Sequence, residues 1–403
     1  MKIKFCRSCK NRNLSRVFSL GKQSLTGIFP SKKTDKITRG NLSLVICNKC
    51  KLLQLENNFN PDEMYGDNYG YMSSLNKSMM SHLKIKALNF KKKYKLKNGD
   101  SILDIGSNDG TFLSYFNNKQ KLYGCDPTIK KFSKYYRKDI KQIPNFFSKK
   151  ILGDKKFNLI TSISMFYDLP DPLNFAKEIF SSLKENGVWH IELSYMPMML
   201  KNLSYDTICH EHLEYYSLKS LKFLLDKANL KIIDLSFNQI NGGSIALDIA
   251  KKKSRYKEIS HLINWILESE EKNQYNELKK QKEFFRQCQK HKHLLKKLLL
   301  SLKNQNKKVL GYGASTKGNV ILQYCNIDSK ILPFIGEVNK FKYNKFTPGS
   351  NIRIISEKKL KKMKPDYLLV LPWHFKDHII KRENKFLKKG GKLIFPLPDI
   401  EII

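Results

Sequence analysis

The sequence predicts an α/β protein with a doubly wound, mostly parallel sheet at its centre, a small lobe before that sheet and a second α/β unit after it. Three observations predict this class. Two Cys-x-x-Cys pairs stand near the N-terminus, strands alternate with helical stretches from about residue 80 to 250, and a strand-turn-helix pattern recurs from residue 307. Because 403 residues are too many for one core, we expect several domains.

The chain carries a large excess of positive charge, with 75 Lys and Arg residues against 36 Asp and Glu and a net charge of +39. The charge is mostly Lys and is spread along the whole chain, without an Arg-rich segment or an RNA-binding motif, so we do not expect nucleic acid as the partner. A negatively charged substrate is compatible with this excess of positive charge. No apolar run reaches the length of a membrane span and no signal peptide is present, so we expect a cytoplasmic protein.

The two cysteine pairs predict a metal site. Cys6 and Cys9 form one knuckle and Cys47 and Cys50 form the other, which together supply four thiolates for a closed tetrahedral Zn²⁺ site. Apolar segments around the second pair predict a hairpin that carries it. A site without an open position predicts a structural ion, and free thiols or disulfides are the alternatives. We expect a zinc-binding lobe over residues 1–70.

The segment ILDIGSNDGTFL, residues 102–113, predicts a cofactor site. A short apolar strand ends in an acidic turn with Gly106 and Gly110, and a helix follows. Asp104 and Asp109 flank this turn, where they would repel a pyrophosphate but suit a cationic ligand. The pattern resembles motif I of class I methyltransferases, which bind S-adenosylmethionine. An ordinary strand-turn-helix is the alternative.

A further acidic residue, Asp126, follows about 20 positions after the first carboxylate of this motif, where such folds hold the ribose hydroxyls. The candidate cofactor-binding residues are Asp104, Gly106, Ser107, Asn108, Asp109, Gly110, Asp126 and Phe147.

The central unit predicts six strands, SILDIG, KLYGCD, FNLITSI, GVWHIELS, KIIDLSF and SIALDIA, with helices between most of them. Residues 251–306 are charged and have apolar positions at helical spacing, which predicts a helical connector. Part of this connector is suited to pairing two subunits, so a monomer and a homodimer both remain open.

The second α/β unit begins with a strand that runs into Gly311 and Gly313, followed by Lys317 and Asn319 at a helix start. The order of residues is not that of a Walker A loop, but backbone N–H groups and one ammonium there suit a phosphate or a sugar hydroxyl. The segments DYLLVLPWHF and GGKLIFPLP predict further strands, and His374 stands at the end of the first, either as a ligand-binding or as a surface residue.

Residues 210–217, HEHLEYYS, concentrate acid-base groups and predict the reactive site. The string is not the HExxH motif of metalloproteases, and three consecutive metal ligands diverge on a regular element. We expect one of the two histidines to have a structural role.

Taken in chain order, CRSC, CNKC, DIGSNDGTFL, HEHLEYYS, NGGS, GASTKGN and LPWHF resemble the sugar C-methyltransferases of deoxysugar biosynthesis. The resemblance spans nearly the whole chain. It implies a class I methyltransferase (Rossmann-like) core over residues 71–250, after the zinc-binding lobe, and a Rossmann-like substrate-binding domain over 307–403. Members transfer a methyl group from S-adenosylmethionine to a ring carbon beside a ketone of a nucleotide-linked keto-deoxysugar.

The resemblance also implies residue roles. His212 would remove the proton next to the carbonyl, because a sugar carbon is nucleophilic only as an enolate, and a pKa near about 6.5 suits this base. Glu211 would orient His212 or share in that step, and Tyr71 and Tyr215 would hold hydroxyls or the enolate oxygen. The implied substrate-binding residues are Asn241, Lys317, Asn319 and His374.

The chain departs from the pattern of that family at three places. It has Cys209 in place of a Tyr, Tyr167 and Asp168 in place of Ala-His, and Asn241 in place of a His. Because these positions face the sugar by resemblance, the methylated atom stays open. An O- or N-methyltransferase on a surface-glycan precursor is one alternative, and a zinc-containing nucleic-acid-binding or RNA-modifying methyltransferase is another.

Overall fold

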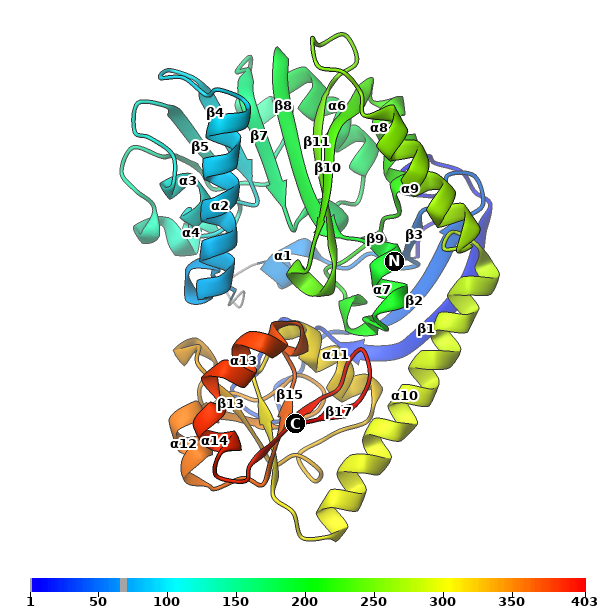
Figure 1. The fold of residues 1–403 in the computed structure, drawn as a ribbon, viewed down its shortest axis with the longest axis vertical. Helices are drawn as coiled ribbons and strands as arrows, with labels where there is room; N and C mark the ends of the chain where they lie inside the picture. The colour runs from blue at the N-terminus through cyan, green and yellow to red at the C-terminus, as the bar shows by residue number, and fades with distance from the viewer. Residues whose placement is uncertain (1, 66–70) are drawn as a thin grey trace.

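The computed structural model describes residues 2–65 and 71–403, which form three sheets joined by one long helix (Figure 1). The central sheet lies at one end of the molecule and the C-terminal sheet at the other, while the N-terminal strands run along one side toward both. Among the described residues, no helix is long and apolar enough to cross a membrane.

The N-terminal sheet is antiparallel throughout, and its order is β1-β2-β3-β9. Its strands are β1 (Leu14–Ser24), β2 (Arg39–Cys47), β3 (Leu53–Leu55) and β9 (Glu214–Tyr215). The hairpin expected around the second cysteine pair is confirmed by β2 and β3. The fourth strand was not expected, because it comes from the HEHLEYYS segment of the central unit.

The central sheet has seven strands in the order β10-β11-β8-β7-β4-β5-β6, and β11 runs antiparallel to both of its neighbours. The strands are β4 (Ser101–Ile105), β5 (Lys121–Cys125), β6 (Lys141–Ile143), β7 (Phe157–Ile163), β8 (Leu183–Ser194), β10 (Leu230–Asn238) and β11 (Ser244–Lys251). All six predicted strands are confirmed. Strand β6 was missed because its three residues, KQI, lack an apolar pattern.

Helices cover the central sheet: α2 (Lys77–Lys93), α3 (Thr111–Ser114), α4 (Ile129–Phe132), α5 (Lys149–Leu152), α6 (Pro172–Ser182) and α8 (Leu218–Lys227). Helix α7 (Met196–Lys201) instead packs through Met196, Met199 and Leu200 in the cluster that joins the N-terminal sheet to the C-terminal unit. A further short helix, α1 (Pro61–Tyr65), follows the N-terminal sheet. Their starts follow local sequence. Asp171 caps α6 by accepting from the backbone N–H of Asn174, with Pro172 in the first turn, and Ser217 and Ser220 form a capping box on α8.

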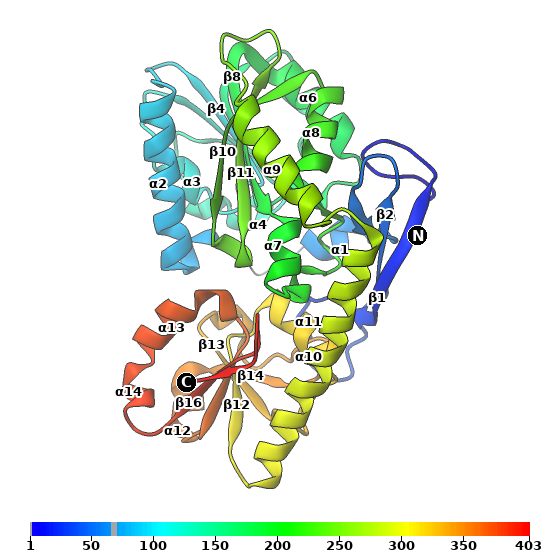
Figure 2. The same ribbon diagram turned by 45° about the vertical axis from the view of Figure 1, so that its right-hand side comes forward.

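The predicted helical connector consists of α9 (Ser260–Lys272) and α10 (Leu278–Asn304). Helix α9 packs on the core of the central unit through Ile263 and Ile266. Helix α10 contacts β1 and the first strand of the C-terminal unit, and it runs from the middle of the molecule, below α9, to the end that carries the C-terminal unit (Figure 2).

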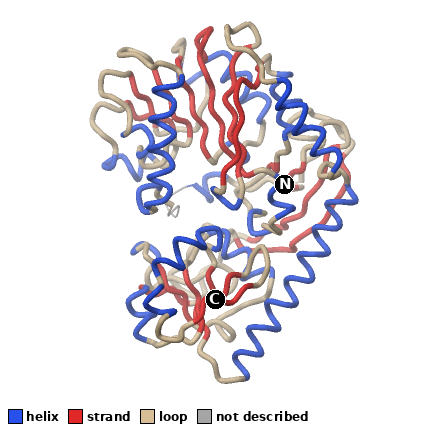
Figure 3. The backbone as a smooth tube through the Cα atoms, viewed as in Figure 1, coloured by secondary structure: helices blue, strands red, loops and turns tan. Residues whose placement is uncertain are grey.

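The C-terminal unit is a six-stranded sheet in the order β14-β13-β12-β15-β16-β17, parallel except for β17. Figure 3 shows its strands as a sheet separate from that of the central unit. Its elements are β12 (Val309–Tyr312), α11 (Thr316–Tyr324), β13 (Phe334–Glu337), β14 (Arg353–Ser356), α12 (Glu357–Lys362), β15 (Tyr367–Val370), α13 (Lys376–Arg382), α14 (Asn384–Leu387), β16 (Lys392–Phe395) and β17 (Glu401–Ile402).

The three units share cores. One apolar cluster joins strands of the N-terminal sheet, such as Leu44, to the C-terminal unit through Tyr205 and Phe284. The N-terminal segment also bonds directly to α11, since the Gln323 side chain accepts from the backbone N–H of Ser24 at 2.8 Å. The residue boundaries of the domains therefore stay a prediction.

Candidate functional site

The four predicted zinc ligands lie together. Their sulfur atoms are all within 4.8 Å of one another, with 3.5 Å between Cys6 and Cys50 and between Cys9 and Cys47. The two knuckles have matching geometry, because the residue after each pair, Lys10 or Lys51, adopts a positive φ and donates its N–H to the first cysteine's carbonyl. Four clustered thiols from two equivalent turns fit a tetrahedral Zn²⁺ site.

The predicted cofactor loop follows β4 at its carboxyl end. Gly106 and Gly110 both have positive φ, and a Cβ on Gly110 would come within 2.9 Å of the ring of Tyr136. The backbone N–H of Asn108 donates to Asp126 at 2.9 Å, which joins the loop to the end of β5. This contact brings the acidic turn after β4 and Asp126 after β5 to the same edge of the sheet.

Burial sets the charge state of this edge. It raises the pKa of Asp104 to about 7, although a hydrogen bond from Thr161 opposes the shift, and it also raises the pKa of Asp126. Asp126 accepts from the backbone and the hydroxyl of Thr128 at 2.7 and 2.6 Å. A cationic ligand beside these carboxyls would lower their pKa values and would be held by ionised groups.

A segment that precedes α2 lies against the same loop. The N–H of Ser73 donates to Asn108, the N–H of Ser74 donates to Asp109, and Asn108 donates to the carbonyl of Tyr71. The Tyr71 side chain itself is 45% exposed. The loop therefore gathers the predicted residues of the first motif and the backbone of Tyr71.

Two aromatic residues, the predicted Phe147 and the unpredicted Tyr136, lie near this part of the central unit. Phe147 packs against Phe175, with 4.9 Å between ring centroids, and its role at the cofactor stays a prediction. Tyr136 was not predicted, yet its hydroxyl lies 2.7 Å from Ser107 Oγ and donates to the carbonyl of Asn108. No motif marks it in the sequence, because it reaches the loop only through the fold.

The candidate base, His212, lies in the loop before β9. Its Nδ1 is 2.7 Å from the carbonyl oxygen of Thr207, so Nδ1 carries the proton and Nε2 is the acceptor. Among the described residues, no hydrogen bond reaches Nε2. The ring packs edge-on against Tyr167 at 4.4 Å, and burial, followed by the charge of Lys317, lowers the pKa of His212 to about 3.

This pKa corrects the expected value near 6.5. Desolvation disfavours the imidazolium and the Lys317 ammonium repels it, so free His212 is neutral at physiological pH.

Glu211 and Tyr215 have other contacts than those expected. The Glu211 carboxylate accepts from the Thr26 hydroxyl at 3.3 Å, and within the described residues Thr207, rather than Glu211, orients the imidazole. Tyr215 donates its hydroxyl to the carbonyl of His212 at 3.0 Å and is buried. Tyr215 therefore holds the backbone of the candidate base, and its role toward the substrate stays a prediction.

His210 has the contacts of a structural residue. It is fully buried, its ring packs edge-on against Phe59, and its Nε2 lies 3.4 Å from the carbonyl of Gly40.

The C-terminal unit brings Lys317 and His374 to the same place. Lys317 donates to the backbone carbonyl of Asn241 at 2.8 Å, and its charge lowers the pKa of both His212 and His374 after the larger effect of burial. The structure thus gathers three of the four predicted substrate-binding residues around the candidate base. The side chain of Asn319 donates to the carbonyl of Thr26, the residue whose hydroxyl donates to Glu211, and its role toward the substrate stays a prediction.

Asp206 is a site residue that sequence reasoning missed. One carboxylate oxygen accepts from the indole N–H of Trp373 at 2.8 Å, and the other is buried without a partner among the described residues. Burial raises its pKa, and the charge of Lys317 opposes the rise. A single Asp gives no signal in the sequence.

The three departures from the family pattern also lie here. Asp168 accepts a hydrogen bond from Tyr65 at 2.8 Å, and burial raises its pKa well above the usual range. Cys209 is buried, and burial and the nearby Glu211 raise its thiol pKa. The amide of Asn241 donates to Ser164 at 3.2 Å.

Glu337 ends β13 beside the Gly311 to Gly313 turn, since the N–H of Gly313 donates to the carbonyl of Gly336 at 2.8 Å. Its carboxylate accepts from two backbone N–H groups at 2.7 and 2.9 Å. This is the position where Rossmann folds hold the hydroxyls of a ribose. An acidic residue that follows a glycine-rich turn and a helix is the sequence signal that indicates such a ribose-binding position.

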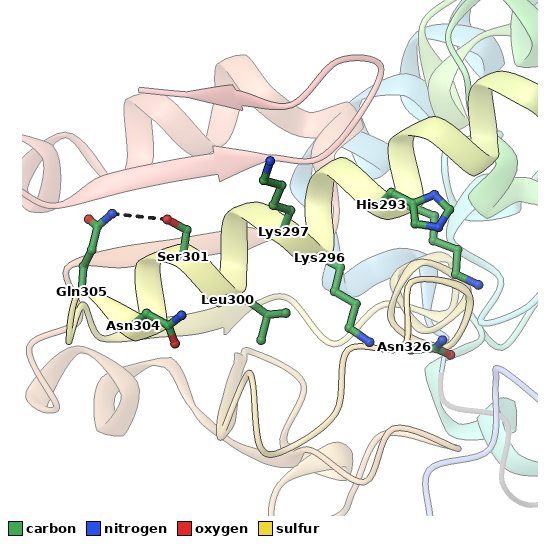
Figure 4. Close-up of a pocket in the computed structure, with 9 residues that line it drawn as sticks. His293, Lys296, Lys297, Leu300, Ser301, Asn304, Gln305 and Asn326 are labelled. Atoms are coloured by element: carbon green, nitrogen blue, oxygen red, sulfur yellow. Dashed lines mark hydrogen bonds between the residues drawn. The ribbon is translucent and has the colours of Figure 1, made fainter.

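Two hollows lie away from these residues. One of about 830 Å³ follows the outer side of α10 and is lined by Lys292, His293, Lys296, Lys297, Leu300, Ser301, Asn304, Gln305 and Asn326 (Figure 4). Another of about 530 Å³ lies between α2 and strands β8, β10 and β11. Neither is lined by a predicted site residue, so the convergence of residues on His212 defines the candidate site.

Comparison with known proteins gives matches along the whole chain. Family models match a zinc binding domain over residues 6–65, a methyltransferase domain over 78–235 and a C-methyltransferase C-terminal domain over 239–398. The C-methyltransferase NovU of Streptomyces niveus is 28% identical over 407 residues, which cover 99% of this chain and 96% of NovU.

Two solved structures resemble a part of the chain. An S-adenosylmethionine-dependent methyltransferase from Clostridium acetobutylicum ATCC 824 is 14% identical with a TM-score of 0.35, and the match covers 43% of this chain and 92% of that one. The plantazolicin methyltransferase BpumL in complex with SAH is 15% identical with a TM-score of 0.34, and the match covers 43% and 83% of the two chains.

Proposed function

The chain belongs to the C-methyltransferase family with an N-terminal zinc-binding domain and is an S-adenosylmethionine-dependent methyltransferase, and we propose that it methylates a ring carbon of a nucleotide-linked keto-deoxysugar. The observation that carries the proposal is the tautomer of His212. With Nδ1 held by the Thr207 carbonyl, Nε2 presents a lone pair that has no partner among the described residues. Carbon methylation requires such a base, because a ring carbon attacks a methyl group only after it loses a proton.

Residues of the central unit hold the methyl donor. The cofactor loop and Asp126 would bind S-adenosylmethionine, whose sulfonium supplies an electrophilic methyl group when bound. The loop follows β4 of the central sheet and the candidate base precedes β9 of the N-terminal sheet, so the packing of these two sheets would set the separation of donor and acceptor. Binding both in line favours transfer by proximity.

Lys317 is the group we assign to the negative charge that develops on the sugar. Burial lowers the pKa of the Lys317 ammonium, and the nearby carboxylate of Asp206 opposes that shift. An enolate oxygen or a phosphate beside it would be stabilised in a site of low dielectric. The same anion would offset the repulsion between Lys317 and protonated His212, and therefore raise the pKa of His212 when the substrate is bound.

The C-terminal unit supports the nucleotide part of the proposal. Glu337 and the Gly311 to Gly313 turn have the arrangement that holds a nucleoside in other Rossmann-like folds. A cytoplasmic location belongs to the proposal as well, since four thiolates that bind Zn²⁺ and four further cysteines outside any disulfide suit a reducing compartment.

The test is to offer the protein a panel of nucleotide-linked 4-keto-6-deoxysugars with S-adenosylmethionine, and to compare it with a His212→Asn variant. Asn keeps an N–H that is able to donate to Thr207 but lacks a base. We expect one sugar to gain a methyl group on carbon, and the variant to lose the activity while its cofactor affinity is unchanged. An exposed histidine on α10, His293, provides the matched control as His293→Asn.

Methylation of a sugar oxygen by both proteins would contradict the proposal and favour the O-methyltransferase alternative. Fragment masses and carbon NMR of the product locate the new methyl group.

A further inference from the structure

A buried arginine stands inside the first cysteine knuckle. Arg7 is 3% exposed, and its guanidinium donates to the carbonyls of Leu55 and Asn57 at 2.7 and 3.1 Å and to Asn58 at 2.5 Å. Its Nε lies 3.6 Å from a carboxylate oxygen of Glu214, the first residue of β9. The zinc-binding lobe thus places a cation against the strand that follows the candidate base.

Glu214 depends on this cation. The residue is 2% exposed, and Arg7 is its ion-pair partner among the described residues. Burial raises the pKa of the Glu214 carboxyl well above its usual range, while Arg7 and a hydrogen bond from the backbone of Leu169 oppose that rise. Taking a carboxylate out of water costs several kcal/mol, and an ion pair at 3.6 Å without a direct hydrogen bond repays that cost poorly. Stability alone therefore does not account for a charged pair at this place.

Strand register offers an account. Strand β9 has two residues, with Leu53 opposite Tyr215 and Gln54 opposite Glu214. A slip by one residue would turn every side chain to the opposite face, and so short a strand specifies its register weakly. A buried carboxyl that has one guanidinium to meet, 3.6 Å away, removes that freedom, as buried polar groups do in coiled coils.

The same contacts reach from the metal site to His212. The Gln54 amide donates to Cys6 Sγ at 3.3 Å and its oxygen accepts from the N–H of Arg7 at 3.0 Å. The N–H of Leu55 donates to the carbonyl of Leu213, the residue after His212, at 2.8 Å. A thiolate cluster around Zn²⁺ carries net negative charge, which Arg7 and Gln54 also offset.

We propose that Arg7 and Glu214 form a positioning link that sets the register of β9 and thereby aims His212, so that the zinc site supports the chemistry without touching the substrate. This inference rests on the proposed role of His212 as the base. It makes Arg7 a positioning residue, separate from the cofactor loop, which it does not contact.

The test compares wild type with Arg7→Met, Glu214→Gln and the double variant Arg7→Met/Glu214→Met. The double variant replaces the pair by apolar side chains, which restores stability in many buried pairs. Deuterium uptake by the keto sugar in heavy water measures the activity of the base. Metal analysis measures zinc content, thermal unfolding measures stability, and calorimetry measures the affinity for S-adenosylmethionine. Arg12→Met, which removes an arginine that lies over the Phe5 ring in the same lobe, is the control.

We expect the variants to keep zinc and cofactor affinity but to lose roughly 10²-fold in the maximal rate of deuterium uptake with little change in KM, as for a base misplaced by about 1 Å. The double variant should regain thermal stability without regaining that rate, whereas Arg7→Lys should recover part of it. If a single variant fails to fold, the double variant decides.

Wild-type rates in the stable double variant would overturn the link, as would a loss of rate that follows thermal stability in every variant. Absence of deuterium uptake by the wild-type protein itself would instead contradict the proposed function.

Discussion

The cofactor loop and the site around His212 are held in different ways. The loop bonds to nearby parts of one unit, since Asn108 meets Asp126 and Ser73. The site around His212 is held by Thr207 from its own unit, by Lys317 from the C-terminal unit and by β3 from the zinc-binding lobe. We therefore expect cofactor binding to depend on one unit, whereas the proposed acceptor chemistry would depend on how three units meet.

Lys317→Met should separate the two regions most strongly. Losing a buried cation at the developing charge should lower kcat/KM by roughly 10²- to 10³-fold, while cofactor affinity stays unchanged. It should also raise the pKa of free His212, because Lys317 lowers it. The acid limb of kcat/KM for deuterium uptake then moves to higher pH than in wild type. Rates measured from pH 9 down to about pH 3, the pKa of free wild-type His212, check both effects, and an acid limb that moves to lower pH would contradict them.

Asp126→Asn tests the other region. Removing the carboxylate that is expected to meet the ribose should weaken S-adenosylmethionine binding by roughly 10- to 100-fold, the value of one or two hydrogen bonds to a charged group. Deuterium uptake without cofactor should remain near the wild-type rate. Calorimetry measures the first effect, and an equal loss of uptake would show that the two regions are not independent.

Glu337→Gln should have a smaller effect on the acceptor side. We expect KM for the nucleotide-linked sugar to rise about 5- to 10-fold, because a charged acceptor of ribose hydroxyls becomes neutral. The cofactor affinity and the maximal rate should not change. Steady-state kinetics with saturating S-adenosylmethionine provide the measurement, and an unchanged KM would place the nucleoside elsewhere.

Trp373→Phe should affect stability more than chemistry. The substitution removes the indole N–H that donates to Asp206, so neither oxygen of this buried carboxyl keeps a side-chain hydrogen bond among the described residues. We expect a cost of about 1–3 kcal/mol in the free energy of unfolding. Denaturant unfolding measures this cost, with Trp265→Phe as control because Trp265 is 66% exposed on α9. Equal stability of the two variants would show that the hydrogen bond from Trp373 to Asp206 does not stabilise the fold.

The same difference explains what the sequence predicts. The four zinc ligands and the Gly-rich turn depend on residue types at short, fixed spacing, so local reasoning finds them. The contact of Glu211 with Thr26 could not be predicted from the sequence, because the two residues lie 185 positions apart and meet only in the tertiary fold. Strands β6 and β13 were not predicted, since three or four residues carry no clear period.

Burial also limits prediction of the chemistry. The lowered pKa of His212 depends on desolvation and on Lys317, which lies 105 residues further along the chain. Asp206 and Tyr136 have no motif, and their contacts appear only once the units are assembled.

The most direct test of the central claim is solvent exchange without methyl transfer. The wild-type protein, a nucleotide-linked 4-keto-6-deoxysugar that it methylates and S-adenosylhomocysteine are mixed in heavy water, and the sugar is followed by proton NMR. The account predicts deuterium at the carbon beside the ketone in the wild-type reaction and none with His212→Asn. Methylation of that sugar without any exchange, or equal exchange in the variant, would contradict His212 as the base.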